Sequence, residues 1–383
     1  MAFPPITPVN PPQPAPGPTF ATDLHPLPGT NLMLDYGTDD VLWFGLNSNS
    51  MTVTIHGGND TVTTGFGNDT IFDDPASGTA SLVNKSSGDD EIHAGQGMDT
   101  IFAGDGHNIY DGGGDVDTVN YSRASVGIDV NLAAGTGEAD GTDTLISIEN
   151  VVGSDHDDHI TGSIDDNVLK GGKGDDVLSG GDGRDTLFGG ADNDTLIGGK
   201  GADTMYGEDG IDTLDYHDSR EGVTVDLLHG IGKGGDAEGD SFKYVENVIG
   251  SRGDDVLIGD NCDNVLNGGT GHDVLFGGGG HDTFAFTSSG FGSSAVSTPA
   301  NPDQIKDFVQ GEDVIDLTHL HVGPYQGPAH VLVDAFTGAA NEVMVSVLPG
   351  TTLVLSDFDG DKVADFAIEL SDPVHLTAAD LLI

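Results

Sequence analysis

The stretch from Gly171 to Asp215 decides the fold: GGKGDDVLS, GGDGRDTLF, GGADNDTLI, GGKGADTMY, GEDGIDTLD. It consists of five nine-residue units with no insertion between them. In every unit the first position is Gly, the sixth is Asp and the eighth is apolar. A strict period of this kind indicates a repeat architecture in which each unit is stabilised by stacking on its neighbours. A Gly/Asp-rich disordered linker would not keep the carboxylate and the apolar side chain in a fixed phase.

Each unit combines a turn with a short strand. Glycines at positions one, two and four permit positive φ and close backbone packing, so that the carbonyls of the turn can converge. The last three residues form a strand with one side chain facing inward. One unit then makes half a coil, and units eighteen residues apart stack on the same edge at about 4.8 Å. We therefore expect Asp176, Asp194 and Asp212 on one edge and Asp185 and Asp203 on the other.

The turn chemistry favours a hard cation. Calcium takes six to eight oxygen ligands in flexible geometry, whereas magnesium demands a tight octahedron and keeps its waters. Carboxylate and carbonyl ligands also disfavour zinc. Stacked carboxylates repel one another unless a cation lies between them, so several Ca²⁺ ions are expected. The candidate metal ligands are the sixth-position carboxylates and four turn glycines: Asp60, Asp69, Asp90, Asp99, Asp117, Asp158, Asp176, Asp185, Asp194, Asp203, Asp212, Asp255, Asp273, Asp282, Gly172, Gly174, Gly181 and Gly183.

The composition supports a chain that folds with its cation. Twelve Lys and Arg oppose 64 Asp and Glu, a net charge of −52, which argues against binding to nucleic acid or anionic membranes. Without counter-ions such a chain repels itself and expands. A single cysteine excludes an intrachain disulfide framework. No apolar run reaches the length of a membrane span, and the N-terminal residues do not form a secretory signal peptide.

The periodicity divides the chain into seven expected segments. They are a proline-rich disordered tail (1–34), a degenerate repeat array (35–120), a β insert (121–152), the main array (153–215), a second insert that duplicates the first (216–249), a last array (250–285) and a β-rich C-terminal domain (286–383). Each insert is expected to hold two or three strands. Both inserts end in the same motif, because Glu149-Asn150-Val151 matches Glu246-Asn247-Val248. Asn108 replaces one sixth-position carboxylate, which predicts a weaker or missing ligand there.

These patterns resemble those of RTX, or haemolysin-type calcium-binding, secreted proteins of bacteria. The span DTFAFTSS…DQIKDFVQGEDVIDLT resembles the C-terminal domain of serralysin-type proteases, and Asp380-Leu381-Leu382-Ile383 is similar to an uncleaved type I secretion signal. The resemblance implies an all-β fold of parallel β-roll segments joined by β inserts, with a β-rich C-terminal capping and secretion domain. It also implies export by the type I secretion machinery and folding in external calcium.

No enzyme motif stands out. The repeats begin near residue 35, which leaves no room for a preceding catalytic domain, and H-E-x-x-H and G-x-S-x-G are absent. We therefore expect a secreted, extracellular, non-enzymatic protein with a structural, adhesive or matrix role. The alternatives are a calcium-dependent accessory module that binds polysaccharide at a cell surface or outside it, and a non-catalytic relative of a secreted metalloprotease.

One acidic motif lies outside the repeats. Asp357, Asp359, Asp361 and Asp365 form D-x-D-G-D-x-x-x-D, which resembles the start of an EF-hand loop without its closing Glu. A polar hairpin turn is the alternative.

Overall fold

The computed structural model describes residues 19–22, 31–33, 40–43, 52–54, 61–64, 69–72, 88–139, 141–287, 297–320 and 330–383. The chain divides into two compact units, one made of residues 1–117 and 141–147 and the other of residues 118–140 and 148–383. The fold is all-β: the described residues contain no α-helix and one short 3₁₀ helix, η1 (Gly235–Ala237). No helix in these ranges is long and apolar enough to cross a membrane.

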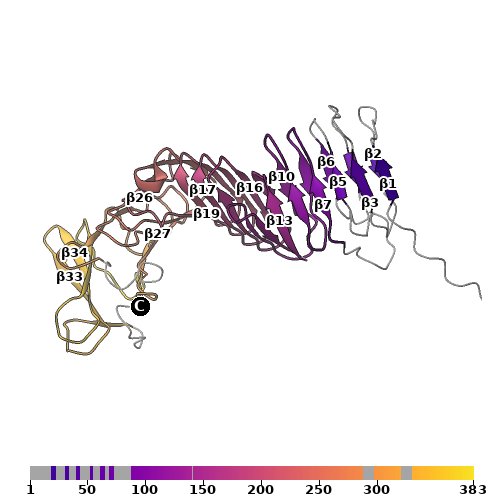
Figure 1. Ribbon diagram of the computed structural model, residues 1–383. Helices are drawn as coiled ribbons and strands as arrows, with labels where there is room; N and C mark the ends of the chain where they lie inside the picture. The colour runs from indigo at the N-terminus through magenta and orange to yellow at the C-terminus, as the bar shows by residue number, and fades with distance from the viewer. Residues whose placement is uncertain are drawn as a thin grey trace, which may run out of the picture. The chain divides into compact units, whose positions relative to one another are not determined.

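The first unit is a β-roll of two parallel sheets (Figure 1). One sheet has the order β1 (Thr19–Thr22), β3 (Asp40–Trp43), β5 (Thr61–Thr63), β7 (Glu91–His93), β9 (Ile109–Asp111) and β13 (Thr142–Ile146). The other has the order β2 (Asn31–Met33), β4 (Thr52–Thr54), β6 (Thr70–Phe72) and β8 (Thr100–Phe102). Strands β1 and β2 lie within residues 1–34, so the expectation of a disordered tail was wrong for these residues.

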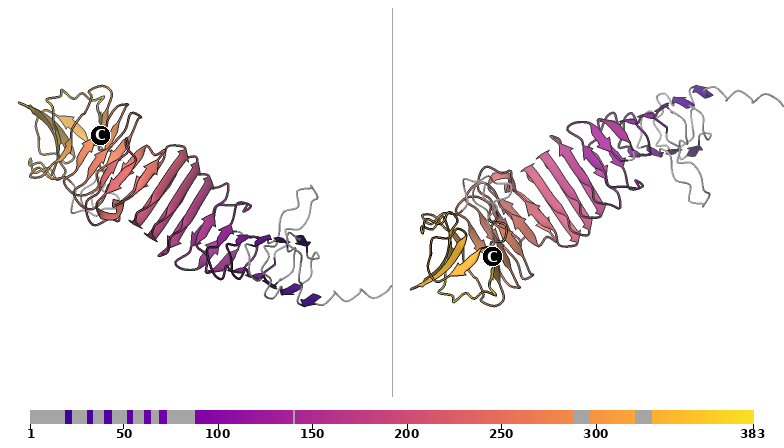
Figure 2. Two further views of the ribbon diagram at one scale, coloured as in Figure 1. Left: turned by 90° about the horizontal axis from the view of Figure 1, so that it is seen from above. Right: turned by 90° about the horizontal axis from the view of Figure 1, so that it is seen from below.

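The second unit also has two sheets built from stacked rungs (Figure 2). One has the order β12 (Thr136–Glu138), β11 (Asp129–Asn131), β15 (His159–Ser163), β17 (Val177–Gly183), β19 (Thr195–Gly201), β21 (Thr213–Asp215), β25 (Asn247–Ile249), β27 (Val265–Asn267), β29 (Thr283–Ala285), β31 (Val314–Asp316) and β36 (Leu381–Leu382). The other begins with β10 (Thr118–Asn120), β14 (Asn150–Val152), β16 (Val168–Lys173), β18 (Thr186–Ala191), β20 (Thr204–Asp209) and β24 (Ser241–Lys243).

Beyond β24 the same sheet contains antiparallel as well as parallel strand pairs. It continues with β23 (Ile231–Lys233), β22 (Thr224–Asp226), β26 (Val256–Ile258), β28 (Val274–Phe276), β30 (Asp303–Ile305), β35 (Phe366–Leu370), β34 (Thr351–Asp357), β33 (Glu342–Leu348) and β32 (Val331–Val333). Strand β34 pairs antiparallel with β33 on one side and with β35 on the other. A non-repetitive end of this kind is what a solenoid needs to cover its last coil.

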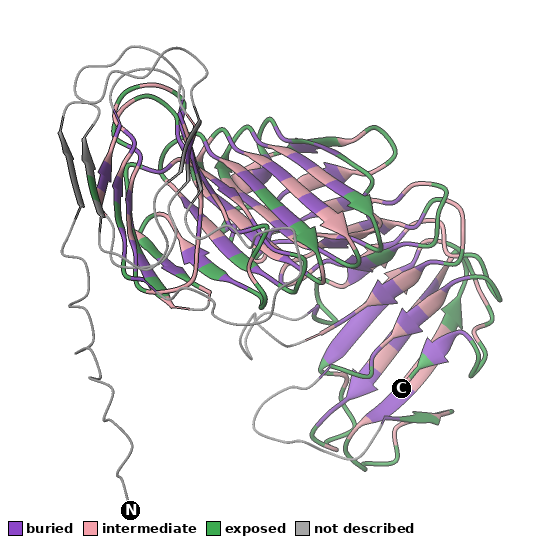
Figure 3. Cartoon of the chain, turned by 90° about the vertical axis from the view of Figure 1, so that its right-hand side faces the viewer, coloured by how far each residue is buried: buried purple, intermediate pink, exposed green. Residues whose placement is uncertain are grey.

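The core is a column of single side chains between the two sheets. In the main array the eighth-position residues Leu178, Leu187, Leu196, Met205 and Leu214 are fully buried. The register pairs residues eighteen apart, as in Leu178 with Leu196 and Leu187 with Met205. Figure 3 shows the resulting alternation of buried and less buried positions along the strands. Parallel strands stacked at about 4.8 Å place these side chains directly over one another.

Two local expectations were wrong. In the main array β16 to β20 are six or seven residues long rather than three, because the glycine turn also pairs with the next coil, as in Gly172 with Gly190 and Gly181 with Gly199. The first insert holds the four strands β11 to β14, and the second holds β22 to β25 with η1, where two or three strands were expected.

Candidate metal-binding turns

The sixth-position aspartates form a ladder along each edge of the roll. On one edge the amide of Asp158 donates to Oδ1 of Asp176 at 2.8 Å, and the amide of Asp176 donates to Oδ1 of Asp194 at 2.9 Å. On the other edge the amide of Asp185 donates to Oδ1 of Asp203 at 2.8 Å. Each carboxylate therefore binds the backbone of the coil that precedes it. The predicted assignment of these residues to two edges is confirmed.

The second oxygen of these carboxylates is left without a partner. The buried Oδ2 atoms that accept no hydrogen bond belong to Asp99, Asp176, Asp185, Asp194, Asp203, Asp212 and Asp273. A buried acceptor left unsatisfied costs about 1–3 kcal/mol, so a whole row of them indicates that a binding partner belongs there. A cation between the turns would be that partner, with the carboxylates as its ligands.

Burial strongly perturbs the ionisation of the same groups. Removal from water raises the pKa of Asp176 to about 8, and the neighbouring Asp158 and Asp194 add to the effect. Burial likewise raises the pKa values of Asp185 and Asp194 to about 7. The pKa of Asp273 is raised by burial and by the adjacent Asp303. A bound cation reverses this logic, because an opposite charge within a few ångströms favours the carboxylate.

The glycines make room for the carboxylates in two ways. At positions two and four the backbone has positive φ, as expected, with values of 130° at Gly172, 109° at Gly174, 108° at Gly181 and 137° at Gly183. At position one φ is not positive, and close packing, the other reason expected for glycine, applies there. A Cβ on Gly171 would lie 2.1 Å from Oδ2 of Asp176, so glycine is needed there because the carboxylate approaches so closely.

The sequence alone did not reveal a second ladder at position five. The amide of Asp175 donates to Oδ1 of Asp157 at 3.0 Å, and the amide of Asn193 donates to Oδ1 of Asp175 at 2.9 Å. This exposed ladder runs in the opposite direction to the buried one. The frequent Asp or Asn at position five was the available signal.

Several acids outside the nonapeptides extend the buried ladder. They are Asp143, Asp240, Glu246, Asp303 and Asp313, whose carboxylates accept from the amides of Asn108, Asp203, Asp212, Asp273 and Asp282 respectively. Each is followed two residues later by a buried apolar residue, as in the repeat. That shared pattern could have identified them from the sequence.

The candidate ligands are not equivalent. At Asp158 and Asp255 both carboxylate oxygens are bonded, because Ser154 and Ser251 donate backbone and hydroxyl groups to them. At Asn167, Oδ1 accepts from the amide of Ser163 and Nδ2 donates to the carbonyl of Glu149, both at 2.7 Å, so both polar atoms have partners. Asp60 lies outside the described residues.

The acidic motif near the C-terminus is a turn between β34 and β35. Potential ligand atoms of Asp357, Asp359 and Asp361 lie within 4.8 Å of one another. Both oxygens of the buried Asp357 already accept from the amides of Gly360 and Lys362, at 2.7 and 2.9 Å. Asp365 accepts from the amide of Phe358 at 2.8 Å. These carboxylates hold the hairpin together through backbone hydrogen bonds.

Comparison with known families accounts for these features. Residues 210–383 match the family model of the peptidase M10 serralysin C terminal region, and residues 56–74, 86–119, 152–187 and 179–214 match the RTX calcium-binding nonapeptide repeat. The chain is therefore an RTX calcium-binding repeat protein with a serralysin-like C-terminal region. Such repeats bind Ca²⁺ in multiple copies, and both regions are typical of secreted bacterial proteins.

The similar individual proteins are matched over short stretches. The metalloprotease AprA of Pseudomonas entomophila (strain L48) and the metallopeptidase AprA of Pseudomonas marginalis are each 40% identical over 80 residues, 20% of this chain. The match spans 16% of the length of each of these relatives. The solution structure of the AlgE6R3 subunit from the Azotobacter vinelandii mannuronan C5-epimerase matches with 22% identity and a TM-score of 0.20, over 60% of this chain and 80% of that one.

The residues of the turns fit calcium. In the five units from Gly171 to Asp215 they offer carboxylate oxygens that lack partners and backbone carbonyls at glycine turns, and these units contain no histidine or cysteine. This is the ligand set of a hard cation.

Proposed function

We propose that this protein is a non-enzymatic extracellular component that calcium folds and stiffens, with a structural or adhesive role. The observation that carries the proposal is the row of buried Oδ2 atoms without a hydrogen-bond partner. Unpaired buried carboxylates are costly, and a cation among them would offset that cost. The net charge of −52 also supports calcium binding, because a chain so strongly negative repels itself unless counter-ions neutralise it.

In this proposal the calcium ligands are the sixth-position carboxylates, together with carbonyls of the glycine turns such as those at Gly172, Gly174, Gly181 and Gly183. The main array supplies the strongest candidates, since Asp176, Asp185, Asp194, Asp203 and Asp212 all have an unbonded Oδ2. Asp158 and Asp255 are weaker candidates because serine satisfies both of their oxygens. The other acids named from the sequence are also proposed as ligands, because they occupy the same sixth position of their repeats.

Calcium would then couple folding to location. Because the ligands come from coils eighteen residues apart, the sites exist only when the coils are stacked, and binding free energy becomes folding free energy. Extracellular modules bind calcium at about 10⁻⁴–10⁻³ M, a range far above cytosolic levels. We propose that the chain stays unfolded inside the cell, leaves through the type I secretion machinery and folds outside.

The test is a far-UV circular dichroism titration of metal-stripped protein with CaCl₂, with MgCl₂ as the comparison. We expect a cooperative gain of β signal with calcium and none with magnesium. Asp194→Asn should raise the calcium midpoint, whereas Asp209→Asn, which removes an exposed carboxylate from the same array, should not. A protein with full β content in chelator at neutral pH would refute the proposal.

A further inference from the structure

A column of side chains crosses the outer face of the second unit, and each belongs to the ninth repeat position or its equivalent. Lys170 on β16, Phe188 on β18, Tyr206 on β20 and Lys243 on β24 lie in register. The rings of Phe188 and Tyr206 are nearly parallel, with centroids 5.0 Å apart, and Nζ of Lys170 lies 5.4 Å from the Phe188 centroid. Phe188 is therefore covered on both sides. Tyr206 ends the aromatic stack on the side of β24.

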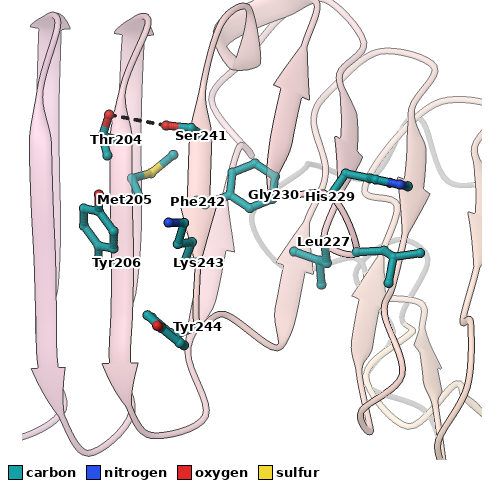
Figure 4. A pocket seen from close by; sticks show the side chains of 11 residues that line it. Thr204, Met205, Tyr206, Leu227, His229, Gly230, Ser241, Phe242, Lys243 and Tyr244 are labelled. Atoms are coloured by element: carbon teal, nitrogen blue, oxygen red, sulfur yellow. Dashed lines mark hydrogen bonds between the residues drawn. The ribbon is translucent and has the colours of Figure 1, made fainter.

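A cavity of about 330 Å³ opens where this stack ends. Its lining includes Tyr206, Leu227, His229, Lys243 and Tyr244 (Figure 4). The hydroxyls of Thr204 and Ser241 also line it, 3.3 Å apart. Its volume lies at the lower end of known ligand cavities, about 300–1,000 Å³, and it combines apolar walls with a few polar groups in the way ligand sites do.

Tyr244 is held in a strained conformation that exposes it. Its φ is 57°, a left-handed value that bulky residues rarely adopt, and the residue is 65% exposed. It also lines a neighbouring hollow of about 310 Å³ together with Gly190, Glu208 and Asp209. Strain of this kind persists where the surrounding structure imposes it and is concentrated at functional sites. Here it presents an aromatic ring between two hollows.

The charges around the cavity select against an anionic ligand. Lys243 brings one ammonium group, but Asp226 lies 2.9 Å from Nδ1 of His229, and Glu208 and Asp209 line the adjoining hollow. The whole chain carries −52, so a polyanion is repelled before it reaches the site. A neutral ligand with an apolar face and hydroxyl edges matches aromatic walls, two hydroxyls and one ammonium donor.

We propose that this cavity binds a neutral pyranose ring of an extracellular glycan. The ring contacts Tyr206 and Tyr244, while Lys243 and Ser241 form hydrogen bonds with its hydroxyls. A glycan bound at this site would be the partner in the proposed adhesive role. The inference rests on that proposed function, because the protein must be outside the cell to meet such a glycan. The geometry of the site does not involve the calcium ligands.

The experiment is isothermal titration calorimetry of the calcium-loaded full chain with cellohexaose, mannohexaose and, as the anionic comparison, hexagalacturonate. We expect binding of a neutral hexasaccharide. Tyr206→Ala and Tyr244→Ala should each weaken it about tenfold, the upper range for one aromatic contact. Phe276→Ala is the matched control, because Phe276 holds the same repeat position on β28 but does not line the cavity. It should leave affinity unchanged.

Three results would overturn the glycan site: neither neutral hexasaccharide binds, both tyrosine variants bind as well as the native chain, or hexagalacturonate binds more tightly than both neutral sugars. Tyr244→Ala keeps the test decisive if Tyr206→Ala disturbs the sheet, because Tyr244 is exposed. A calcium titration of the same samples separates the two proposals. Calcium-driven folding without sugar binding would refute the glycan site alone, and tyrosine-dependent sugar binding by a chain that folds in chelator would refute the calcium proposal alone.

Discussion

Replacing Asp194 by asparagine tests the calcium ladder at a single atom. Oδ1 can still accept from the amide of Asp176, so the backbone contact to the neighbouring coil is kept. Oδ2 becomes an NH₂ group, which cannot bind a cation and needs an acceptor. At the natural Asn108, Oδ1 accepts from the amide of Asp90 in the same way, and Nδ2 donates to Oδ1 of Asp143 in the following coil at 3.0 Å. Oδ1 of Asp212 is the equivalent acceptor for residue 194, so Asp194→Asn removes a proposed cation ligand and keeps its hydrogen bonds.

The magnitude follows from the lost ligand. A site saturated at 100 times its Kd contributes about 2.7 kcal/mol to the free energy of unfolding. We expect urea unfolding in millimolar calcium to show a loss of about 2.7 kcal/mol, with a higher calcium midpoint in the folding titration. Asp209→Asn should stay within about 0.5 kcal/mol, as surface substitutions do.

The unfolding free energy and the calcium midpoint should change together, because one bound ion produces both effects. Equal unfolding free energies and calcium midpoints for Asp194→Asn and the native chain would refute the reasoning.

Three further outcomes follow from the same structure. In chelator, β signal should rise as the pH falls from about 8 to about 5, because the folded-state pKa values of Asp176 and Asp194, raised to about 8 and 7, make the folded chain bind more protons than the unfolded chain in that window; β signal independent of pH there would contradict this. Gly180→Ala should weaken calcium binding, since its Cβ would lie 2.3 Å from Oδ2 of Asp185, while Gly279→Ala, whose nearest neighbour is 3.7 Å away, should not; calorimetric calcium titrations compare the two. Leu196→Ala should cost about 2–5 kcal/mol of unfolding free energy in calcium, as the loss of a buried leucine does, and a cost below about 1 kcal/mol in urea unfolding would show that the column is not a packed core.

The period of nine was enough to predict the parallel roll, its two edges and its inward column. It succeeded because each unit repeats the same turn chemistry and buries the same position, so local preference and global packing agree. The phase of the aspartates also placed the carboxylates correctly. What it could not give was the distribution of hydrogen bonds, which depends on which neighbouring coil each carboxylate faces.

The Glu-Asn-Val motif shows why the rest was missed. The duplication of Glu149-Asn150-Val151 was visible in the sequence, but its role depends on the coil eighteen residues later, where Asn167 takes the place of a sixth-position aspartate. There Asn150 accepts from the amide of Val168, which leaves the Glu149 carbonyl free to accept from Nδ2 of Asn167. The copy at Asn247 and Asn264 repeats the arrangement. Likewise, the glycine at position one looked like a turn residue and proved to be a spacer for a carboxylate.

The buried ladder gives the second unit a direction. In its two runs of repeats, from Asp158 to Asp212 and from Asp255 to Asp282, each sixth-position amide is satisfied by a carboxylate from the coil that follows it. The last of these carboxylates are Asp303 and Asp313, which accept from Asp273 and Asp282. Removing a coil from the N-terminal side leaves a carboxylate that water can solvate. Removing one from the C-terminal side instead takes away the acceptor of a buried amide in the preceding coil, and that amide is left without a hydrogen bond. The repeats should therefore tolerate truncation from the N-terminal side better than truncation from the C-terminal side, where the carboxylates that accept from the last coils are located.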